Sequence, residues 1–437
     1  MTTWLLIVAA APFVLTLLVL AVREPMRVAL PVFAALVPFG KGLSVGSSSF
    51  GSLSSLAGLL LAAGLALQLV STRRAAPRLS ASVPIWLLFL ATAAATFLWT
   101  IDSSTTLDGL FVLGALVLVF VLAAMSPVDR VALRRTENGV LVGGTAAVLY
   151  GLYQLVVLGG FPDDVPGADI ATDGRFGNDL LGPGVTALAL LPPLLIALSR
   201  AFRQAPPASR WMYGVIAALM FWGIMMTGSR TGTLAVGLAL LVLAFAGPRR
   251  ARRPIVAMFF LGILLASAIW VFQPAGVATR SFESPTSSSG RTDIWQVGLA
   301  SCTDYCAKGS GWGTFPEVYA QEQASVPGAR VLVGRQGSYQ PHNLWLLAAV
   351  ELGVAGLLLL FAGLATSTWE AFRLPPELRG PPLSMMAGLL VAVFFLSSME
   401  FKVFWLILIL VAMSRTLDLT EREAEDRRTA ALTSAEP

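Results

Sequence analysis

The sequence carries little charge for its length. Asp, Glu, Lys and Arg make up 13% of its 437 residues, whereas hydrophobic residues make up 56%. Soluble domains carry about 25% charged residues, so a mean hydropathy of +0.75 excludes a water-soluble fold that hides its apolar surface in one core. The formal net charge of +5 requires no acidic partner, because most Arg residues lie in short clusters between apolar runs.

Residues that commonly hold metals or nucleotides are scarce. The chain has one histidine, His342, and two cysteines, Cys302 and Cys306, and this set does not make a zinc site. Four carboxylates lie close together in one stretch of the chain, namely Asp163, Asp164, Asp169 and Asp173. We interpret this stretch as an acidic loop exposed to solvent rather than as a cation site. The GxxxxGK[ST] motif of nucleotide-binding loops is absent. We therefore expect no metal, no cofactor and no nucleic-acid substrate.

Long apolar runs recur from end to end, and a membrane-spanning helix needs roughly 20 mostly apolar residues. We therefore predict an all-α, polytopic integral membrane protein with about 12 transmembrane helices. The membrane domain covers residues 1–413, and a charged cytoplasmic tail covers 414–437. The candidate spans are Trp4–Val22, Val28–Val45, Leu53–Val70, Val83–Trp99, Leu110–Met125, Val140–Leu158, Leu180–Leu198, Met212–Met226, Thr231–Ala246, Ile255–Phe272, Leu344–Gly363, Leu383–Leu396 and Phe401–Met413. An alternative joins the last two into one bent helix. The first run lacks the basic start and cleavage site of a signal peptide, so we expect a retained span.

The distribution of Arg predicts the orientation. Clusters around Arg73, Arg130, Arg200 and Arg249 alternate with connections that are acidic or nearly uncharged. The positive-inside rule assigns the clusters to the cytoplasm. The opposite face then receives one large extracytoplasmic loop, residues 273–342, which is far longer than a turn needs and is expected to be folded and functional.

Four stretches on this outer face hold Arg or His next to a span. They are DGRFGNDLLGPG with Arg175, MMTGSRTGTLA with Arg230, SSSGRTDIWQVGLA with Arg291, and SYQPHNLWLL with His342. Any one Arg at this depth is also explained as an anchor that reaches the lipid headgroups. Arg230 lies in a very short turn between spans, and an ionisable group at membrane depth costs at least ~2.5 kcal/mol, so it should face a wet cavity or a partner.

Several guanidiniums and one imidazole together suit a lipid-linked diphosphate. Guanidinium forks bind phosphate and stay charged at every relevant pH, and they stabilise a departing diphosphate without a metal. An incoming sugar hydroxyl benefits from a general base, and histidine has a suitable reference pKa of about 6.5. The alternative for His342 is that it only caps the helix that starts near Asn343.

Five motifs in order resemble the O-antigen ligase and polymerase family of membrane glycosyltransferases. PHNLWLLAAVELGVAGLLLL resembles the family signature, TGSRTGTLA its Ser-Arg turn, and SGRTDIWQVGLA the opening of its large outer loop. KGSGWGTFPEVYA resembles the Gly-rich segment that follows, and GRFGNDLLGPGVTALALLPPLL an earlier Arg, Gly and Asn segment. The resemblance covers about 173–361, and each motif alone is short.

The resemblance implies an all-helical fold of the GT-C-like class. It implies transfer of a glycan, without a metal, from undecaprenyl diphosphate to a glycan or glycolipid acceptor at the outer face of the bacterial cytoplasmic membrane. Arg230 and Arg291 would contact the diphosphate, and His342 would activate the acceptor hydroxyl. Arg175 matches less closely, because its segment has Gly-Asn-Asp where the family pattern has Gly-Asn-Pro-Asn.

Weaker candidates support this site. Asn343 follows the histidine, Glu351 lies further into the same span and either orients the site or faces a polar cavity, and Trp312 is a candidate for sugar stacking. A disulfide between Cys302 and Cys306 is allowed in an oxidising compartment, but the four-residue spacing leaves it open.

Other polar and aromatic residues have simpler explanations. Trp295 and Trp345 fit an aromatic belt at the membrane surface. Glu400 and Lys402 are expected to cap the final hairpin and to pair with each other.

Two other functions remain open at this point. A polymerase of the same class would join lipid-linked repeat units, and a polysaccharide or lipid transporter would also have about a dozen spans. Transporters often place charges at the bilayer midplane and contain inverted repeats, whereas these Arg and His residues lie at the outer edge and we find no repeat. The sugars, the acceptor and the oligomeric state are not determined by the sequence.

Overall fold

The structure, a computed structural model, describes residues 16, 18–40, 43, 51–71, 80–161, 174–202, 206–247, 250, 252–272, 291–327 and 340–433. These residues form helices joined by turns, and no β-strand occurs among them, which confirms the predicted all-α class. The first candidate span, Trp4–Val22, lies mostly outside this part of the chain. The acidic residues Asp163, Asp164, Asp169 and Asp173 lie outside it as well.

The long helices overlap the predicted apolar runs, but several of them extend well beyond the predicted bounds. The helices are α2 (Ala29–Leu36), η1 (Val37–Phe39), α3 (Leu53–Ser71), α4 (Ser82–Ala95), η2 (Thr96–Leu98), α5 (Ser103–Ala124), α6 (Arg130–Val157), α7 (Pro183–Phe202), α8 (Pro207–Met226), α9 (Arg230–Ala246), α10 (Arg252–Phe272), α11 (Arg291–Ala300), α12 (Cys302–Tyr305), α13 (Phe315–Glu322), α14 (Leu344–Phe372), α15 (Pro376–Ala392), η4 (Ser398–Glu400) and α16 (Lys402–Thr433).

Seven helices in the described ranges are long and apolar enough to cross a membrane, namely α3, α5, α6, α7, α8, α14 and α16. Three shorter apolar helices cover Ala29–Phe39, Ser82–Leu98 and Arg230–Ala246. The chain is thus an all-helical membrane protein, and the predicted number of about 12 spans stays a prediction.

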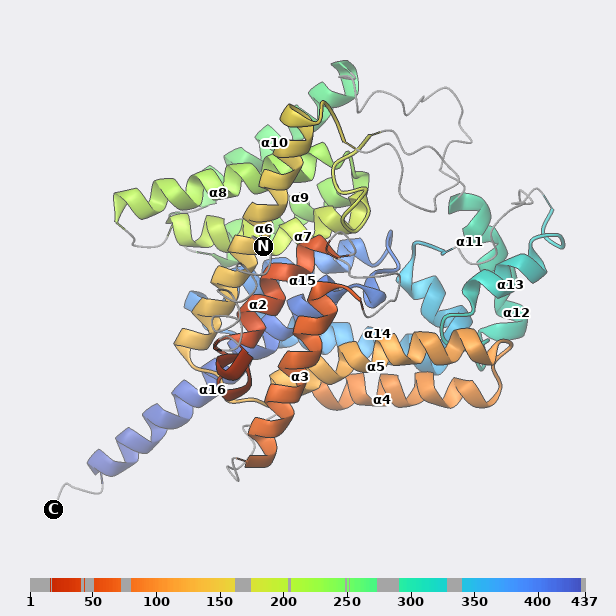
Figure 1. Ribbon diagram of the computed structural model, residues 1–437, viewed down its shortest axis with the longest axis horizontal. Coiled ribbons are helices and arrows are strands. Elements are labelled where there is room, and N and C mark those ends of the chain that lie inside the picture. Colours follow the sequence, from red (N-terminus) through yellow and green to blue (C-terminus); the bar gives the residue numbers. More distant parts are fainter. Residues whose placement is uncertain are drawn as a thin grey trace, which may run out of the picture.

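The bundle is built around α7 and α16. In their apolar windows, 89% of α7 and 83% of α16 is buried inside the protein, so these two helices are shielded from lipid by their neighbours. Helix α9 packs against α15, α7 against α8, and α4 against both α14 and α5. Figure 1 shows α11, α12 and α13 gathered at one end, while the C-terminal part of α16 projects from the opposite end.

The last apolar segment is two helices, and the predicted boundaries there need correction. The run Leu383–Leu396 predicted a helix to Leu396, but α15 ends at Ala392. The reason is a contact remote in sequence, because the carbonyl of Val393 accepts the backbone N–H of Leu344 at 2.8 Å. Residues 393–401, which include η4, then connect α15 to α16.

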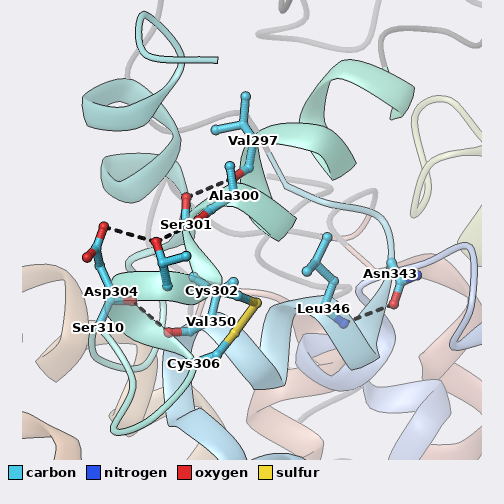
Figure 2. Close-up of a disulfide and its surroundings, with 11 residues drawn as sticks. Val297, Ala300, Ser301, Cys302, Asp304, Cys306, Ser310, Asn343, Leu346 and Val350 are labelled. Atoms are coloured by element: carbon cyan, nitrogen blue, oxygen red, sulfur yellow. Dashed lines mark hydrogen bonds between the residues drawn. A yellow bond between two sulfur atoms is a disulfide. The ribbon is translucent and has the colours of Figure 1, made fainter. Parts of the chain in front are cut away.

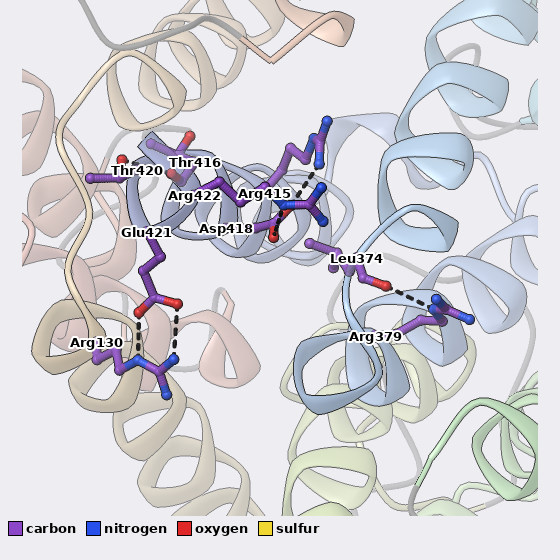
Figure 3. Close-up of polar contacts among 9 residues, drawn as sticks. All are labelled: Arg130, Leu374, Arg379, Arg415, Thr416, Asp418, Thr420, Glu421 and Arg422. Carbon is purple, nitrogen blue, oxygen red and sulfur yellow. Dashed lines mark hydrogen bonds and ion pairs between the residues drawn. The ribbon is translucent and has the colours of Figure 1, made fainter. Parts of the chain in front are cut away.

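The charged tail does not begin where the apolar residues end. Helix α16 continues without a break from Lys402 to Thr433. Asp418 is 4% exposed and pairs with Arg415 at 2.7 Å and Arg422 at 2.8 Å, as Figure 3 shows. The neighbouring Glu421 accepts from Arg130 at the start of α6 at 2.8 Å. The first turns of the tail are therefore attached to the bundle.

Helix α14 is broken at Gly353, and this break fixes the segment 306–315. Gly353 has φ 69°, a conformation that glycine adopts readily and other residues rarely do. Main-chain carbonyls next to the break accept hydrogen bonds from this segment: the N–H of Ser310 donates to Val350 at 2.9 Å, and that of Gly311 to Glu351 at 3.0 Å. The neighbouring side-chain bond between Ser310 and Val350 is visible in Figure 2.

Candidate functional site

A cavity of about 380 Å³ lies where several helices begin, and it brings together the four residues that the sequence singled out. Ligand pockets are commonly about 300–1,000 Å³, so the volume suits a substrate headgroup. The lining residues are Arg175, Leu181, Gly182, Pro183, Gly184, Val185, Ser229, Arg230, Thr231, Arg291, Gln340, His342, Leu396, Ser397, Glu400 and Phe401.

Arg230 is the first residue of α9 and follows a tight turn. Ser229 caps the helix, since its hydroxyl accepts the N–H of Gly232 at 3.1 Å. Gly228 has φ 56°, which a residue with a side chain adopts only at a cost. This conformation ends α8 and starts α9 within three residues, so that Arg230 reaches the cavity instead of the lipid.

Arg175 is held against the same turn. Its Nε and Nη2 atoms donate to the carbonyl oxygen of Thr227 at 2.8 and 2.6 Å. Thr227 is the C-cap residue of α8. Its carbonyl has no partner within the helix, and the guanidinium of Arg175 supplies the missing hydrogen-bond donors. Arg175 therefore both lines the cavity and supports the turn that carries Arg230.

His342 lies directly before α14, in an unusual backbone conformation. It has φ 47° and is the only non-glycine residue with a positive φ in the part of the chain that the structure describes. Such conformations cost about 1–2 kcal/mol for residues with a Cβ and are concentrated at functional sites. The helix cap is the next residue, because the side chain of Asn343 accepts the N–H of Leu346 at 3.0 Å (Figure 2). Capping is thus the role of Asn343 and does not explain His342.

The imidazole of His342 is neutral at ordinary pH. Burial, followed by the positive charge of Arg291, lowers its pKa from 6.5 to about 4. Both causes oppose a second proton, because the charged imidazolium loses hydration and is repelled by the guanidinium. A neutral imidazole can accept a proton from a hydroxyl.

Five helices begin at this cavity. The lining residues include the starts of α7 at Pro183, α9 at Arg230 and α11 at Arg291, and they flank the starts of α14 and α16. A helix N-terminus carries a partial positive charge and unpaired N–H groups. Three Arg side chains and these helix ends outweigh the one lining carboxylate, that of Glu400, so the cavity favours anions.

The sequence did not identify three other polar residues that line the cavity. Glu400 and Ser397 come from the segment between α15 and α16, and Gln340 from the segment before His342. The oxygens Oε1 of Gln340 and Oγ of Ser397 are buried without a hydrogen-bond partner in the described part of the chain. The polar break SSMEFK between two apolar runs, on the predicted outer face, was the available signal.

The sequence predicts that Glu400 and Lys402 cap the final hairpin and pair with each other. Instead Glu400 lines the cavity, while the ammonium group of Lys402 donates to the hydroxyls of Ser52 at 3.1 Å and Ser54 at 3.0 Å.

Two of the supporting candidates have structural roles. Glu351 is 1% exposed, and its carboxylate accepts the backbone N–H groups of Gly313 at 2.9 Å and Phe315 at 3.1 Å. It therefore anchors the segment before α13 and caps that helix. The prediction that Trp312 stacks on a sugar is wrong: its side chain is 1% exposed and packs edge-on against Phe89, which leaves no face for a ligand.

Cys302 and Cys306 form a disulfide across α12, shown in Figure 2. The adjacent backbone of Cys306 also accepts the N–H of Val354 at 2.8 Å, just past the break in α14. The disulfide and the broken helix together hold the short helices α11–α13 at this end of the bundle.

A comparison with known protein families matches the part of the chain that carries three of these cavity residues. The family model described as O-antigen ligase matches residues 215–361, from within α8 to the middle of α14. The matched segment contains Arg230, Arg291 and His342, whereas Arg175 and Glu400 lie outside it. No curated protein matches the chain.

Proposed function

We propose that this chain, which belongs to the O-antigen ligase family through residues 215–361, transfers a glycan from undecaprenyl diphosphate to an acceptor hydroxyl at the outer face of the bacterial cytoplasmic membrane. The observation that supports this most strongly is the single cavity that Arg175, Arg230, Arg291 and His342 share. These residues come from four separate segments, and no local feature of the chain requires them to meet.

The guanidiniums and helix ends suit a diphosphate. Arg230 and Arg291 would bind the phosphate oxygens in the ground state and hold the negative charge that develops as the diphosphate leaves. Arg175, which also lines the cavity, would add a third positive charge beside the diphosphate. Three guanidiniums and a single carboxylate, that of Glu400, line the cavity, a set that does not suit a divalent metal ion, so the proposed chemistry depends on protein groups alone.

His342 would act on the acceptor. As the bond between the anomeric carbon and the diphosphate oxygen breaks, the acceptor oxygen forms the new glycosidic bond and its proton passes to the imidazole. Arg291 is one cause of the low pKa of His342, after burial. A bound diphosphate would offset that charge, so donor binding would make His342 a stronger base at the moment when a base is needed.

The arrangement of charges supports an outer location for the cavity. Helix α7 begins at the cavity and ends near Arg200, whose guanidinium pairs with Glu137 on α6. Arg130 likewise pairs with Glu421 beyond the apolar part of α16. The Arg-rich end is thus opposite the cavity, and the positive-inside rule assigns that end to the cytoplasm. A disulfide on the cavity side agrees, because disulfides persist in oxidising compartments.

The test uses protein purified in lipid nanodiscs, with a glycan-bearing undecaprenyl diphosphate and a separate glycolipid acceptor. We expect transfer that persists in EDTA and a loss of donor affinity in Arg291→Gln and Arg230→Gln. Arg210→Gln is the matched control, since Arg210 is an exposed Arg at the other end of the bundle.

Each outcome has a clear meaning. Longer chains from the donor alone would identify a polymerase, and transfer to the second acceptor a ligase. Equal donor affinity in Arg291→Gln, Arg230→Gln and Arg210→Gln would contradict the proposed diphosphate site.

A further inference from the structure

The peptide group between Pro341 and His342 is held by a residue from another helix. The indole N–H of Trp295 donates to the carbonyl oxygen of Pro341 at 2.7 Å. That carbonyl belongs to the same planar peptide unit as the N–H of His342. Its orientation therefore helps to set the left-handed φ of 47° at His342.

Trp295 lies on the same helix as a cavity Arg. Arg291 and Trp295 are four residues apart on α11, so they lie one above the other on one face of the helix. The helix itself is well seated, because Ile294 and Val297 are 7% and 0% exposed. One rigid element thus carries both a cavity guanidinium and the donor that holds the peptide before the histidine.

The other bonds near His342 come from different elements. Asn343 caps α14 through Leu346, and the N–H of Leu344 donates to Val393 at the end of α15. These bonds fix the start of α14 but leave the peptide before His342 unconstrained. The bond from Trp295 ties this peptide to α11.

We propose that Trp295 is a positioning residue, whose indole N–H holds the Pro341–His342 peptide so that the imidazole stays in the cavity beside Arg291. The proposal deepens the proposed function and rests on it for the catalytic consequence, but the geometry can be tested without activity. An aromatic belt at the membrane surface, the simpler explanation of Trp295, requires no such bond.

Loss of the bond has a directional consequence for the histidine. The charged groups that share the cavity with it are Arg175, Arg230, Arg291 and Glu400. Without the bond, His342 can relax toward the extended backbone that L-residues prefer. Its imidazole then moves away from Arg291 and toward water, so both causes of its low pKa weaken and the pKa rises toward 6.5.

The single histidine makes this measurable. Protein without a histidine tag, labelled with ¹³C,¹⁵N-histidine, gives one set of imidazole resonances to titrate by NMR. We expect His342 to titrate near pH 4 in the wild type. In Trp295→Phe we expect it to titrate about one to two pH units higher, because the imidazole is less buried and lies farther from Arg291. Trp345→Phe is the matched control, because its indole Nε1 is buried and makes no hydrogen bond within the described residues.

A kinetic arm separates positioning from general damage. In Trp295→Phe we expect kcat to fall roughly 10- to 100-fold through misplacement of the base, with little change in the KM for the donor. Trp345→Phe should keep the wild-type kcat. Trp295→Tyr is measured alongside as a second variant that keeps a large ring, in case Trp295→Phe does not fold.

Several results would overturn the proposal. One is that His342 titrates at the same pH in both Trp295 variants as in the wild type. Another is that the Trp345→Phe control shifts the titration of His342 by the same amount as Trp295→Phe does. Absence of transfer by the wild-type protein would instead refute the proposed function, and the titration would still decide the role of Trp295.

Discussion

Replacement of Glu351 by glutamine tests the anchoring role of this carboxylate, which binds the segment before α13. The carboxylate accepts two backbone N–H groups, from Gly313 and Phe315, at a site that is 1% exposed. A glutamine offers only one oxygen, so its NH₂ group faces the second N–H. One buried donor then lacks a partner, at a cost of about 1–3 kcal/mol.

This cost should appear as local opening. The anchored segment would open roughly 5- to 150-fold more often, since each 1.4 kcal/mol is a factor of ten. Hydrogen exchange measured by mass spectrometry on peptides that cover residues 310–319 reports that opening directly. Glu351→Ala removes both acceptors and should accelerate exchange further.

A second buried carboxylate on α14 supplies the control. Glu370 accepts the hydroxyl of Ser80 and the N–H of Ala81, both at 2.7 Å. Glu370→Gln should therefore accelerate exchange around residue 81 and leave residues 310–319 unchanged. Unchanged exchange at 310–319 in Glu351→Gln, combined with complete loss of transfer, would refute the anchoring role and return Glu351 to the catalytic site.

Three further predictions concern His342 and the disulfide. Wild-type kcat/KM should be constant through neutral pH and fall only toward about pH 4, and Arg291→Gln should move this acid limb to higher pH; an acid limb near 6.5 in wild type would contradict the buried, charge-repelled imidazole. His342→Gly should melt at a higher temperature than His342→Ala although both lack transfer activity, because a left-handed residue with a Cβ costs about 1–2 kcal/mol, offset by about 0.5–1 kcal/mol of glycine entropy. A more stable alanine variant would contradict the positive φ. Thiol labelling of intact cells should detect Cys302 and Cys306 only after a membrane-impermeant reductant, and labelling before reduction would argue against the disulfide on the outer face.

The helices and the cluster of catalytic candidates were largely predictable from the sequence. Apolar runs indicated the helices. The short turn at Gly228 indicated that Arg230 faces a polar cavity or a partner. The order of short motifs indicated that Arg230, Arg291 and His342 belong together, although only folding could show that they share a cavity. The sequence offered helix capping as the alternative role of His342, whereas the cap is the next residue, Asn343, whose side chain accepts the N–H of Leu346.

The features that were missed depend on contacts between distant segments. Helix α15 ends before Leu396 because Val393 is engaged by Leu344, and hydropathy cannot register such a bond. Trp312 is buried against Phe89 on α4, a contact between segments more than 200 residues apart that the local sequence around Trp312 does not show. Tryptophan is common at membrane surfaces, so the sequence alone gives Trp295 no other role. Only the position of Pro341 in the fold reveals its hydrogen bond.

The most direct test of the account is an electron cryomicroscopy map of the protein in nanodiscs with undecaprenyl diphosphate bound. The account predicts density for the two phosphates between Arg175, Arg230 and Arg291, next to the imidazole of His342, with the lipid tail leaving toward the membrane. Phosphate density at the Arg-rich end of the bundle, or at the cavity but remote from all three guanidiniums, would contradict it.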